Sequence, residues 1–400
     1  MCAVFMIFLA GRNQITKEKV FDCGLPVMFI ETDGAKKIKS KETYIDADFE
    51  IFENYASYAE DAGKKYRGKI RGRGNTTWTF RKKPYFAKLR EKNSVLGMPA
   101  AQKWTIRPFM TDKSKVRDAY ATYLASTIYT NTSGGWIPSF KFVNLYLNNN
   151  FSGLYCVYEK VEQGENRMNL PEGSFLFVVN SRLNKEWNFR SENGVPFSLV
   201  DNDVAEEKFL KEKEILENIE KQIYLADNSE VFDFIDKASF VDWYILNEFA
   251  KNRDSNFLAS CFMAFDSKAK KLYMGPVWDF DIAFGGSHMD NNFSPEDPWI
   301  NQFHWYKELW RNEEFREAVK QRWNETKSQL KDSFRYISEQ AKILAPSAEI
   351  DDLVWQTIGR KQWPLTPGYR SRKTYISEVE YVYSWLFKRY DWMDSYLNSL

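Results

Sequence analysis

The stretch that most constrains the fold is a pair of strand-forming runs in the second half of the chain. Residues 257–265 (FLASCFMAF) and 272–280 (LYMGPVWDF) are largely apolar and aromatic, and a short polar loop separates them. This arrangement predicts a β-hairpin. If the strands pair symmetrically about the loop, Asp281 lies opposite Asn256, and Asp254 lies within a residue or two of both.

Oxygen-bearing side chains therefore gather at the open end of this hairpin. Asp279 and Asp281 are two residues apart in an extended segment, so their carboxylates point to the same face. Carboxylate and amide oxygens are the ligands that divalent cations take in proteins. We predict a metal site formed by Asp279, Asp281 and Asn256; the alternative is an Asp-rich turn with no ligand.

Charge is unevenly distributed along the chain, although the net charge is only +1. Between Lys64 and Arg117 there are 17 Lys or Arg and two acidic residues, a net +15, which leaves −14 for the rest. A basic part facing an acidic part that contains the Asp cluster suits a polyanion bridged by metal ions, such as a nucleoside triphosphate. A solvated basic surface or a nucleic-acid groove are the alternatives.

Residues 69–77 (KIRGRGNTT) form a basic loop with two glycines. Glycine lets the backbone approach an anion closely, and Arg71 and Arg73 are suited to clamp phosphate oxygens. The loop lacks the spacing of a P-loop, so the motif alone is not diagnostic.

Residues 84–90 read as a strand on which Lys88 has apolar neighbours, which favours a binding role or an edge position with a snorkelling stem. A second predicted hairpin, 140–147 with 154–161, ends beside Glu159 and Glu162. Either glutamate is a candidate partner for Lys88 or an ordinary surface charge.

The remaining pattern predicts strands first and helices later. Residues 25–200 form a β-rich lobe, residues 201–400 form a mainly helical lobe, and residues 1–24 form an N-terminal segment with the short apolar start of a trimmed export signal. Ser239 and Asp242 resemble a capping box for a helix that runs to about Lys251. Further strands are expected at 26–32, 44–52, 104–109 and 175–179, and further helices at 115–129, 206–225, 302–344 and 371–400.

Cysteine and histidine are too few and too scattered for several kinds of site. The four cysteines show no CxxC spacing, and His288 and His304 are the only histidines. A structural zinc site and a catalytic Cys-His pair are therefore not expected. No apolar stretch reaches transmembrane length.

Four motifs in chain order resemble the CotH (spore-coat protein H) family of atypical protein kinases: the RGRGN loop at 71–75, Lys88, NRDSN at 252–256 and WDFD at 278–281. The resemblance extends over residues 25–400. It implies a two-lobed, kinase-like α+β fold that binds ATP with Mg²⁺ or Mn²⁺ and transfers the γ-phosphoryl group to Ser or Thr hydroxyls of a protein substrate. The family's association with spore coats and the envelope implies an exported or envelope location.

The resemblance also implies roles for individual residues. Lys88 matches the ATP-phosphate lysine, Glu159 the glutamate after the second hairpin, and Asp279 the metal-binding aspartate. Asp254 matches the aspartate of the N-x-D segment, where it orients the acceptor hydroxyl or serves as a second metal ligand. The sequence lacks the H-R-D-x-x-x-x-N loop of ordinary kinases, so their division of metal ligands does not transfer.

Two rival functions remain open at this stage. One is a non-catalytic envelope or coat-assembly protein that keeps the fold for binding. The other is a carbohydrate-active protein whose carboxylates act as a pair and whose many aromatic residues, 17% of the chain, form sugar platforms. Nucleic-acid binding is less favoured, because no recognised nucleic-acid module appears.

Overall fold

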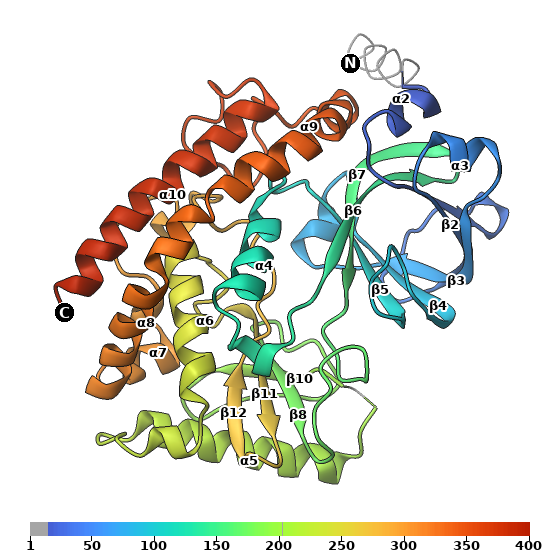
Figure 1. Cartoon of the computed structure of the whole chain (residues 1–400). Coiled ribbons are helices and arrows are strands. Elements are labelled where there is room, and N and C mark those ends of the chain that lie inside the picture. The colour runs from blue at the N-terminus through green and yellow to red at the C-terminus, as the bar shows by residue number, and fades with distance from the viewer. Residues whose placement is uncertain (1–14, 202) are drawn as a thin grey trace.

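The computed structural model describes residues 15–201 and 203–400, so most of the expected export-signal segment lies outside the described residues. The protein is a mixed α+β structure with a β-rich N-terminal part and a helical C-terminal part. Figure 1 shows the barrel strands on one side, helices α6, α8, α9 and α10 on the other, and α4 between them. None of the described helices has the length and apolar composition needed to cross a bilayer.

The N-terminal strands close into a barrel, in the order β1-β2-β3-β4-β5-β7-β6. The strands are β1 (Val27–Thr32), β2 (Ile45–Phe52), β3 (Lys64–Gly72), β4 (Tyr85–Asn93), β5 (Ala101–Pro108), β6 (Phe140–Leu147) and β7 (Asn150–Glu159). Parallel pairing of β1 with β6 completes the closure. The sequence predicted a β-rich lobe here but not a closed barrel.

Strand β1 is apolar on both faces, and this suits its place at the closure. Met28 and Ile30 fill the barrel interior, whereas Val27 and Phe29 pack in a separate cluster with residues from α2 (Lys17–Phe21) and near α3 (Tyr55–Ala59). Alternate side chains of a strand point to opposite faces, so both faces are removed from water.

A second, five-stranded sheet has the order β12-β11-β8-β10-β9. Its strands are β8 (Phe175–Asn180), β9 (Asn188–Arg190), β10 (Pro196–Leu199), β11 (Ala259–Asp266) and β12 (Lys271–Met274). Met263 pairs with Met274 and Asp266 with Lys271, so the predicted register of the hairpin is confirmed. Pairing ends at Met274, however, and the segment that carries Asp279 leaves the sheet as an irregular loop.

Seven helices of six residues or more support the two sheets within the described residues. They are α4 (Arg117–Thr127), α5 (Glu206–Tyr224), α6 (Lys237–Ala250), α7 (His304–Leu309), α8 (Glu313–Asp332), α9 (Arg335–Trp355) and α10 (Tyr375–Asn398). Helix α6 is buried at every position from Ser239 to Ala250, as its nearly uniform apolar sequence requires. It therefore forms the centre of the helical part.

Two helix predictions need correction. The N-cap of α6 is Asp236, whose carboxylate accepts a hydrogen bond from the Ser239 amide at 2.7 Å, so the predicted Ser239–Asp242 capping box is wrong. Asp242 is instead buried and pairs with Arg322 at 2.7 Å. The helical region predicted over 302–344 is divided into α7, α8 and the first half of α9, and Asn312 caps α8.

A buried ionic cluster joins the barrel to the helical part. Lys82, in the loop before β4, places Nζ 2.6 Å from Oδ1 of Asp351 on α9 and 2.6 Å from the Leu154 carbonyl on β7. Lys115, just before α4, lies 3.3 Å from the other carboxylate oxygen of Asp351. All three charged side chains are at most 2% exposed, so each depends on the others for compensation.

Candidate active site

A cleft of about 370 Å³ lies where the barrel, the second sheet and the loop after β12 meet. Four of the residues predicted from the sequence line it: Arg73, Asp254, Asp279 and Asp281. Basic side chains that the sequence analysis did not single out line it as well, namely Arg107, Arg182 and Arg253. The cleft therefore combines carboxylates from the helical part with guanidinium groups, two of which come from the barrel.

The turn after α6 holds Asp254 in place. Helix α6 ends at Lys251, which adopts a left-handed conformation with φ of 43°. Asn252 then accepts a hydrogen bond from the Asp254 amide through Oδ1 at 3.3 Å and another from the Ser255 hydroxyl through its carbonyl at 2.6 Å. Since Trp299 also donates to the Asn252 carbonyl at 2.9 Å, the turn is fixed from both sides.

Asp279 adopts an uncommon backbone conformation with φ of 70°. Aspartate tolerates this region better than most residues, and such positions cluster at functional sites. Its Oδ1 lies 2.5 Å from Nη2 of Arg107. The neighbouring Asp281 accepts a short hydrogen bond from the Thr111 hydroxyl, so both carboxylates are oriented by groups from the region of β5.

Arg107, near the end of β5, links the two halves of the cleft. Its Nη2 also lies 3.0 Å from Asp118, in the first turn of α4, and its guanidinium faces the rings of Tyr158 and Trp278. Asp118 in turn accepts a hydrogen bond from the Phe280 amide at 2.7 Å. Helix α4 thereby positions both the arginine and the backbone of the segment that carries Asp279.

The same contacts shift the acidity of the site. Burial, aided by the charge of Asp279, raises the pKa of Asp254 to about 7 and that of Asp281 well above its ordinary value. Burial raises the pKa of Asp118 to about 6, although Arg107 opposes the shift. Burial alone would lower the pKa of Arg107, but Asp118 and Asp279 outweigh it and raise that pKa.

Arg73 reaches the cleft from the loop between β3 and β4. Burial and the like charge of Arg107 lower its pKa to about 10, so both guanidinium groups remain charged at neutral pH. Arg107 Nη1 is buried and has no hydrogen-bond partner among the described residues. An unpaired buried donor beside a second arginine suits an anionic ligand.

The oxygen donors of this site suit a cation that binds with waters and phosphate oxygens as further ligands. Asn256 is 5% exposed, and its buried Oδ1 has no hydrogen-bond partner among the described residues. Within the part of the chain that the structure describes, no three His, Cys, Asp or Glu side chains form a ready metal cluster. Mg²⁺ typically takes one or two carboxylates together with waters and substrate phosphates, so Asp279 and Asp281 fit that role better than a preformed cage, whereas Asn256 is absent from the cleft lining.

Besides the buried Asn256, three predicted site residues do not line this cleft. Lys88 lies on the outer face of β4, flanked on the neighbouring strands by Lys69 and Lys103. Arg71 donates to the Lys41 carbonyl and packs its guanidinium over the rings of Tyr44 and Phe86.

The third, Glu159, does not form the expected pair with Lys88. Its carboxylate lies 2.6 Å from Arg167 and accepts a hydrogen bond from the Ser139 amide at 2.8 Å. Strand alternation explains the difference, because Tyr155 and Val157 on the same side of β7 face the barrel interior whereas Lys88 points outward.

Sequence reasoning missed Arg107, Thr111 and Asp118. Arg107 was part of a predicted strand and Asp118 part of a predicted helix, and no local motif marks either residue. The one available signal was the concentration of basic residues between Lys64 and Arg117, which includes Arg107. That signal indicated a charged face without indicating which side chains enter the cleft.

Fold and cleft together define an α+β protein whose site sets arginines from the barrel against carboxylates from the helical part. The chain belongs to the CotH kinase protein family, whose sequence model matches residues 70–393. No curated protein matches the chain. Family membership confirms the resemblance carried by the four motifs and suggests a kinase-like function.

Proposed function

We propose that this protein is a metal-dependent ATP phosphotransferase with a kinase-like fold that phosphorylates Ser or Thr hydroxyls of a protein substrate. The observation that carries the proposal is that Asp254 and Asp279 share one cleft with Arg73 and Arg107. Phosphoryl transfer requires positioning and charge neutralisation more than covalent chemistry from the protein. A cleft that holds both signs of charge meets that requirement.

Each group has a role in this proposal. Asp279, with Asn256 and Asp281, would hold Mg²⁺ or Mn²⁺, and Arg73 and Arg107 would bind phosphate oxygens. Bound ATP would supply the γ-phosphoryl group, and the cation would neutralise part of the phosphate charge. The acceptor oxygen forms a bond to the γ-phosphorus as the bond to the β-phosphate breaks, and ADP leaves.

Asp254 is suited to accept the proton of the acceptor hydroxyl. A general base works best when its pKa lies near the working pH, and burial raises the pKa of Asp254 towards that range. The alternative role, a second metal ligand, uses the same carboxylate in its charged form. Arg253 beside it is paired with Asp290 at 2.6 Å, and no described Lys or Arg lies within ion-pair distance of Asp254.

The pair formed by Arg107 and Asp118 supports the kinase-like interpretation. In protein kinases a lysine on a strand pairs with a glutamate of the next helix, and the pair positions the nucleotide phosphates. Here β5 supplies Arg107 and the following helix, α4, supplies Asp118 at 3.0 Å. The geometry favours Arg107 over Lys88 for the phosphate-binding role.

Intact-mass spectrometry tests the proposal directly. The protein is incubated with ATP, Mg²⁺ or Mn²⁺ and a Ser-rich acceptor, beside an Asp279→Ala control. Addition of one or more phosphate masses that the control lacks supports the proposal. Nucleotide binding without transfer under either metal would indicate a non-catalytic member of the family, and binding of oligosaccharides in preference to ATP would favour the carbohydrate interpretation.

A further inference from the structure

The segment between α9 and α10, residues 356–374, contributes Trp363 to the wall of the cleft; we call it the α9–α10 segment. Trp363 lines the cleft together with Asp254 and Asp279, and its ring lies 5.9 Å from that of Phe80 in the loop between β3 and β4. On the other side, the Leu365 carbonyl lies 3.1 Å from Nδ1 of His288, in the loop that follows the metal-binding aspartates. The segment therefore contacts both loops that border the cleft.

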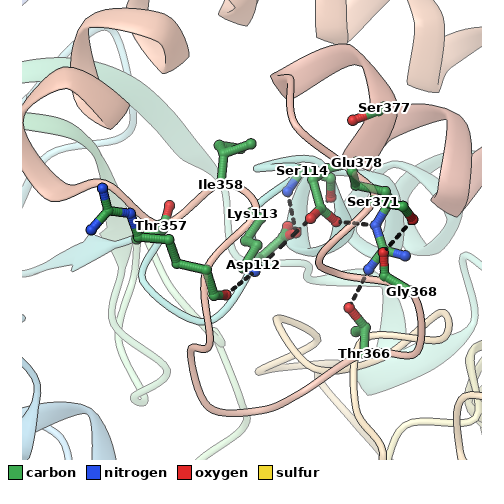
Figure 2. Close-up of polar contacts among 12 residues, drawn as sticks. Asp112, Lys113, Ser114, Thr357, Ile358, Thr366, Gly368, Ser371, Ser377 and Glu378 are labelled. Carbon is green, nitrogen blue, oxygen red and sulfur yellow. Dashed lines mark hydrogen bonds and ion pairs between the residues drawn. The ribbon is translucent and has the colours of Figure 1, made fainter.

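Polar contacts hold the α9–α10 segment in place. Figure 2 shows Asp112, Lys113 and Ser114 beside Thr366 and Glu378. Lys113 Nζ donates to the Arg360 carbonyl at 2.8 Å, and Arg372 donates to Glu378 at 2.8 Å and to the Thr366 hydroxyl. These anchors are buried, since Lys113 is 6% exposed and Glu378 2%. The segment is thus a fixed part of the cleft rim.

The α9–α10 segment is strongly basic on its outer side. It contains five Lys or Arg and no Asp or Glu. Arg372 forms an ion pair with Glu378. The other four, Arg360, Lys361, Arg370 and Lys373, are exposed, and no described carboxylate lies within ion-pair distance of them. The side chain of Lys373 lies against Gly359, so the two ends of the segment bring their charges together.

These exposed charges lie outside the part of the cleft that would receive a nucleotide. Trp363 is the segment's contribution to the cleft wall, whereas the four exposed basic residues are absent from it. Arg73 and Arg107 already provide cations inside the cleft. Trp363 is also 36% exposed, so its ring is accessible from solvent at the cleft wall.

We propose that the α9–α10 segment binds the acceptor, and that the acceptor carries acidic residues flanking its Ser or Thr. This inference rests on the proposed phosphotransferase function. Trp363 packs against the chain beside the hydroxyl, and Arg360, Lys361, Arg370 and Lys373 pair with the flanking carboxylates. Charge complementarity selects this occupant, because the segment that carries Trp363 also presents four exposed positive charges with no described carboxylate within ion-pair distance.

The experiment compares two Ser peptides that differ only in their flanks, Asp and Glu in one and Asn and Gln in the other. The full-length protein is tested beside a variant with Arg360→Gln, Lys361→Gln, Arg370→Gln and Lys373→Gln. The matched control removes four exposed lysines elsewhere, through Lys36→Gln, Lys37→Gln, Lys39→Gln and Lys268→Gln. Transfer gives kcat and KM, and fluorescence anisotropy of Ala-for-Ser peptides gives binding without chemistry.

We expect KM for the acidic peptide to rise ~10-fold or more in the rim variant, with kcat within about twofold, because several exposed ion pairs of modest strength are lost together. KM for the neutral peptide, and KM for both peptides in the control variant, should change little. Added salt should weaken binding of the acidic peptide to the unmodified protein and leave the other combinations unaffected. Equal kcat/KM for the two peptides, or equal losses for both in the rim variant, would overturn the proposal.

The anisotropy measurement separates this inference from the proposed function. Rim-dependent binding of the acidic Ala peptide without any transfer would support the docking surface while refuting the phosphotransferase. Phosphoryl transfer at the same rate to acidic and neutral peptides would support the phosphotransferase and refute the docking surface. Tighter rim-dependent binding of single-stranded nucleic acid or anionic vesicles than of the acidic peptide would also reject an acidic protein segment as the occupant.

Discussion

Nη2 of Arg107 lies 2.5 Å from Oδ1 of Asp279, and this contact closes the base of the cleft between the barrel and the loop after β12. Asp118 contacts the same nitrogen at 3.0 Å, so one guanidinium balances two carboxylates. A cation bound by Asp279 would share that carboxylate with Arg107. The two positive partners would then be held at fixed separation, as a polyphosphate bridging them requires.

Replacing Asp279 with Ala should lower phosphoryl transfer at least ~100-fold, because the proposed cation loses its principal ligand. The fold should survive, since Arg107 keeps Asp118. Calorimetric titration with Mn²⁺ and a thermal melt check both parts. Asp46→Ala is the matched control, since it removes an exposed carboxylate on β2, outside the cleft lining. Equal activity losses in the two variants would contradict the metal assignment.

Arg73→Ala and Lys88→Ala distinguish the two candidate phosphate-binding groups. Arg73 lines the cleft whereas Lys88 lies on the outer barrel face. Loss of a charge-assisted contact should raise the KM for ATP roughly 10-fold or more in the Arg73 variant. The Lys88 variant should stay within about twofold. A larger effect at Lys88, measured by initial rates against ATP, would restore the role that the family resemblance implies for it.

Asp118→Asn should destabilise the protein and slow transfer together. Asp118 is 6% exposed and compensates a buried arginine, and breaking such a pair typically costs about 3–5 kcal/mol. Asp279 retains part of the compensation, so we expect the lower end of that range. Urea denaturation measures the change in unfolding free energy. Asp48→Asn, which removes an exposed pair with Arg67, should cost less than about 1 kcal/mol.

Asp254 should make the metal-free protein less stable as the pH rises. Its folded-state pKa of about 7 lies above the unfolded value of roughly 3.9. Between these values the folded state binds the extra proton, so the free energy of unfolding falls with rising pH until the full penalty is present above pH 7. The penalty is at most about 4 kcal/mol, and less where water screens the half-buried carboxyl.

Asp254→Asn removes this titration. In the presence of a chelator, the variant should therefore be more stable than the parent protein at pH 8, and the difference should shrink towards zero near pH 4. Melting temperatures across this range provide the measurement. A stability gain that is the same at pH 5 and pH 8 would mean that the carboxyl does not titrate in this interval.

The sequence predicted the hairpin because its information is local. Two apolar runs around a polar loop define the register, and Met263 pairs with Met274 as symmetry requires. The same register indicated where Asp254, Asp279 and Asp281 would gather, and all three line the cleft. Strand pairing ends at Met274, however, so Asp281 does not pair opposite Asn256 as predicted, and the loop after β12 brings Asp279 and Asp281 to the cleft.

Barrel closure and the arginine positions depend on distant contacts. Val27 pairs in parallel with Asn144 across more than a hundred residues, and no local pattern encodes that partner. Alternation along β4 showed that Lys88 and its neighbours face opposite sides, but it could not show which side meets the cleft. Asp236 and Ser239 are both residue types that cap helices well. Helix α6 begins after Asp236 because the Asp236 carboxylate accepts a hydrogen bond from the Ser239 amide.

The buried cluster of Lys82, Asp351 and Lys115 has a mechanical consequence. It fixes the barrel to α9, because moving the two apart as rigid bodies would separate buried opposite charges. Wide opening of the two halves is therefore disfavoured as a route for exchange of a bound molecule. We expect entry and exit to depend on movement of the loop around Phe80, while Trp363 and the rest of the frame stay in place.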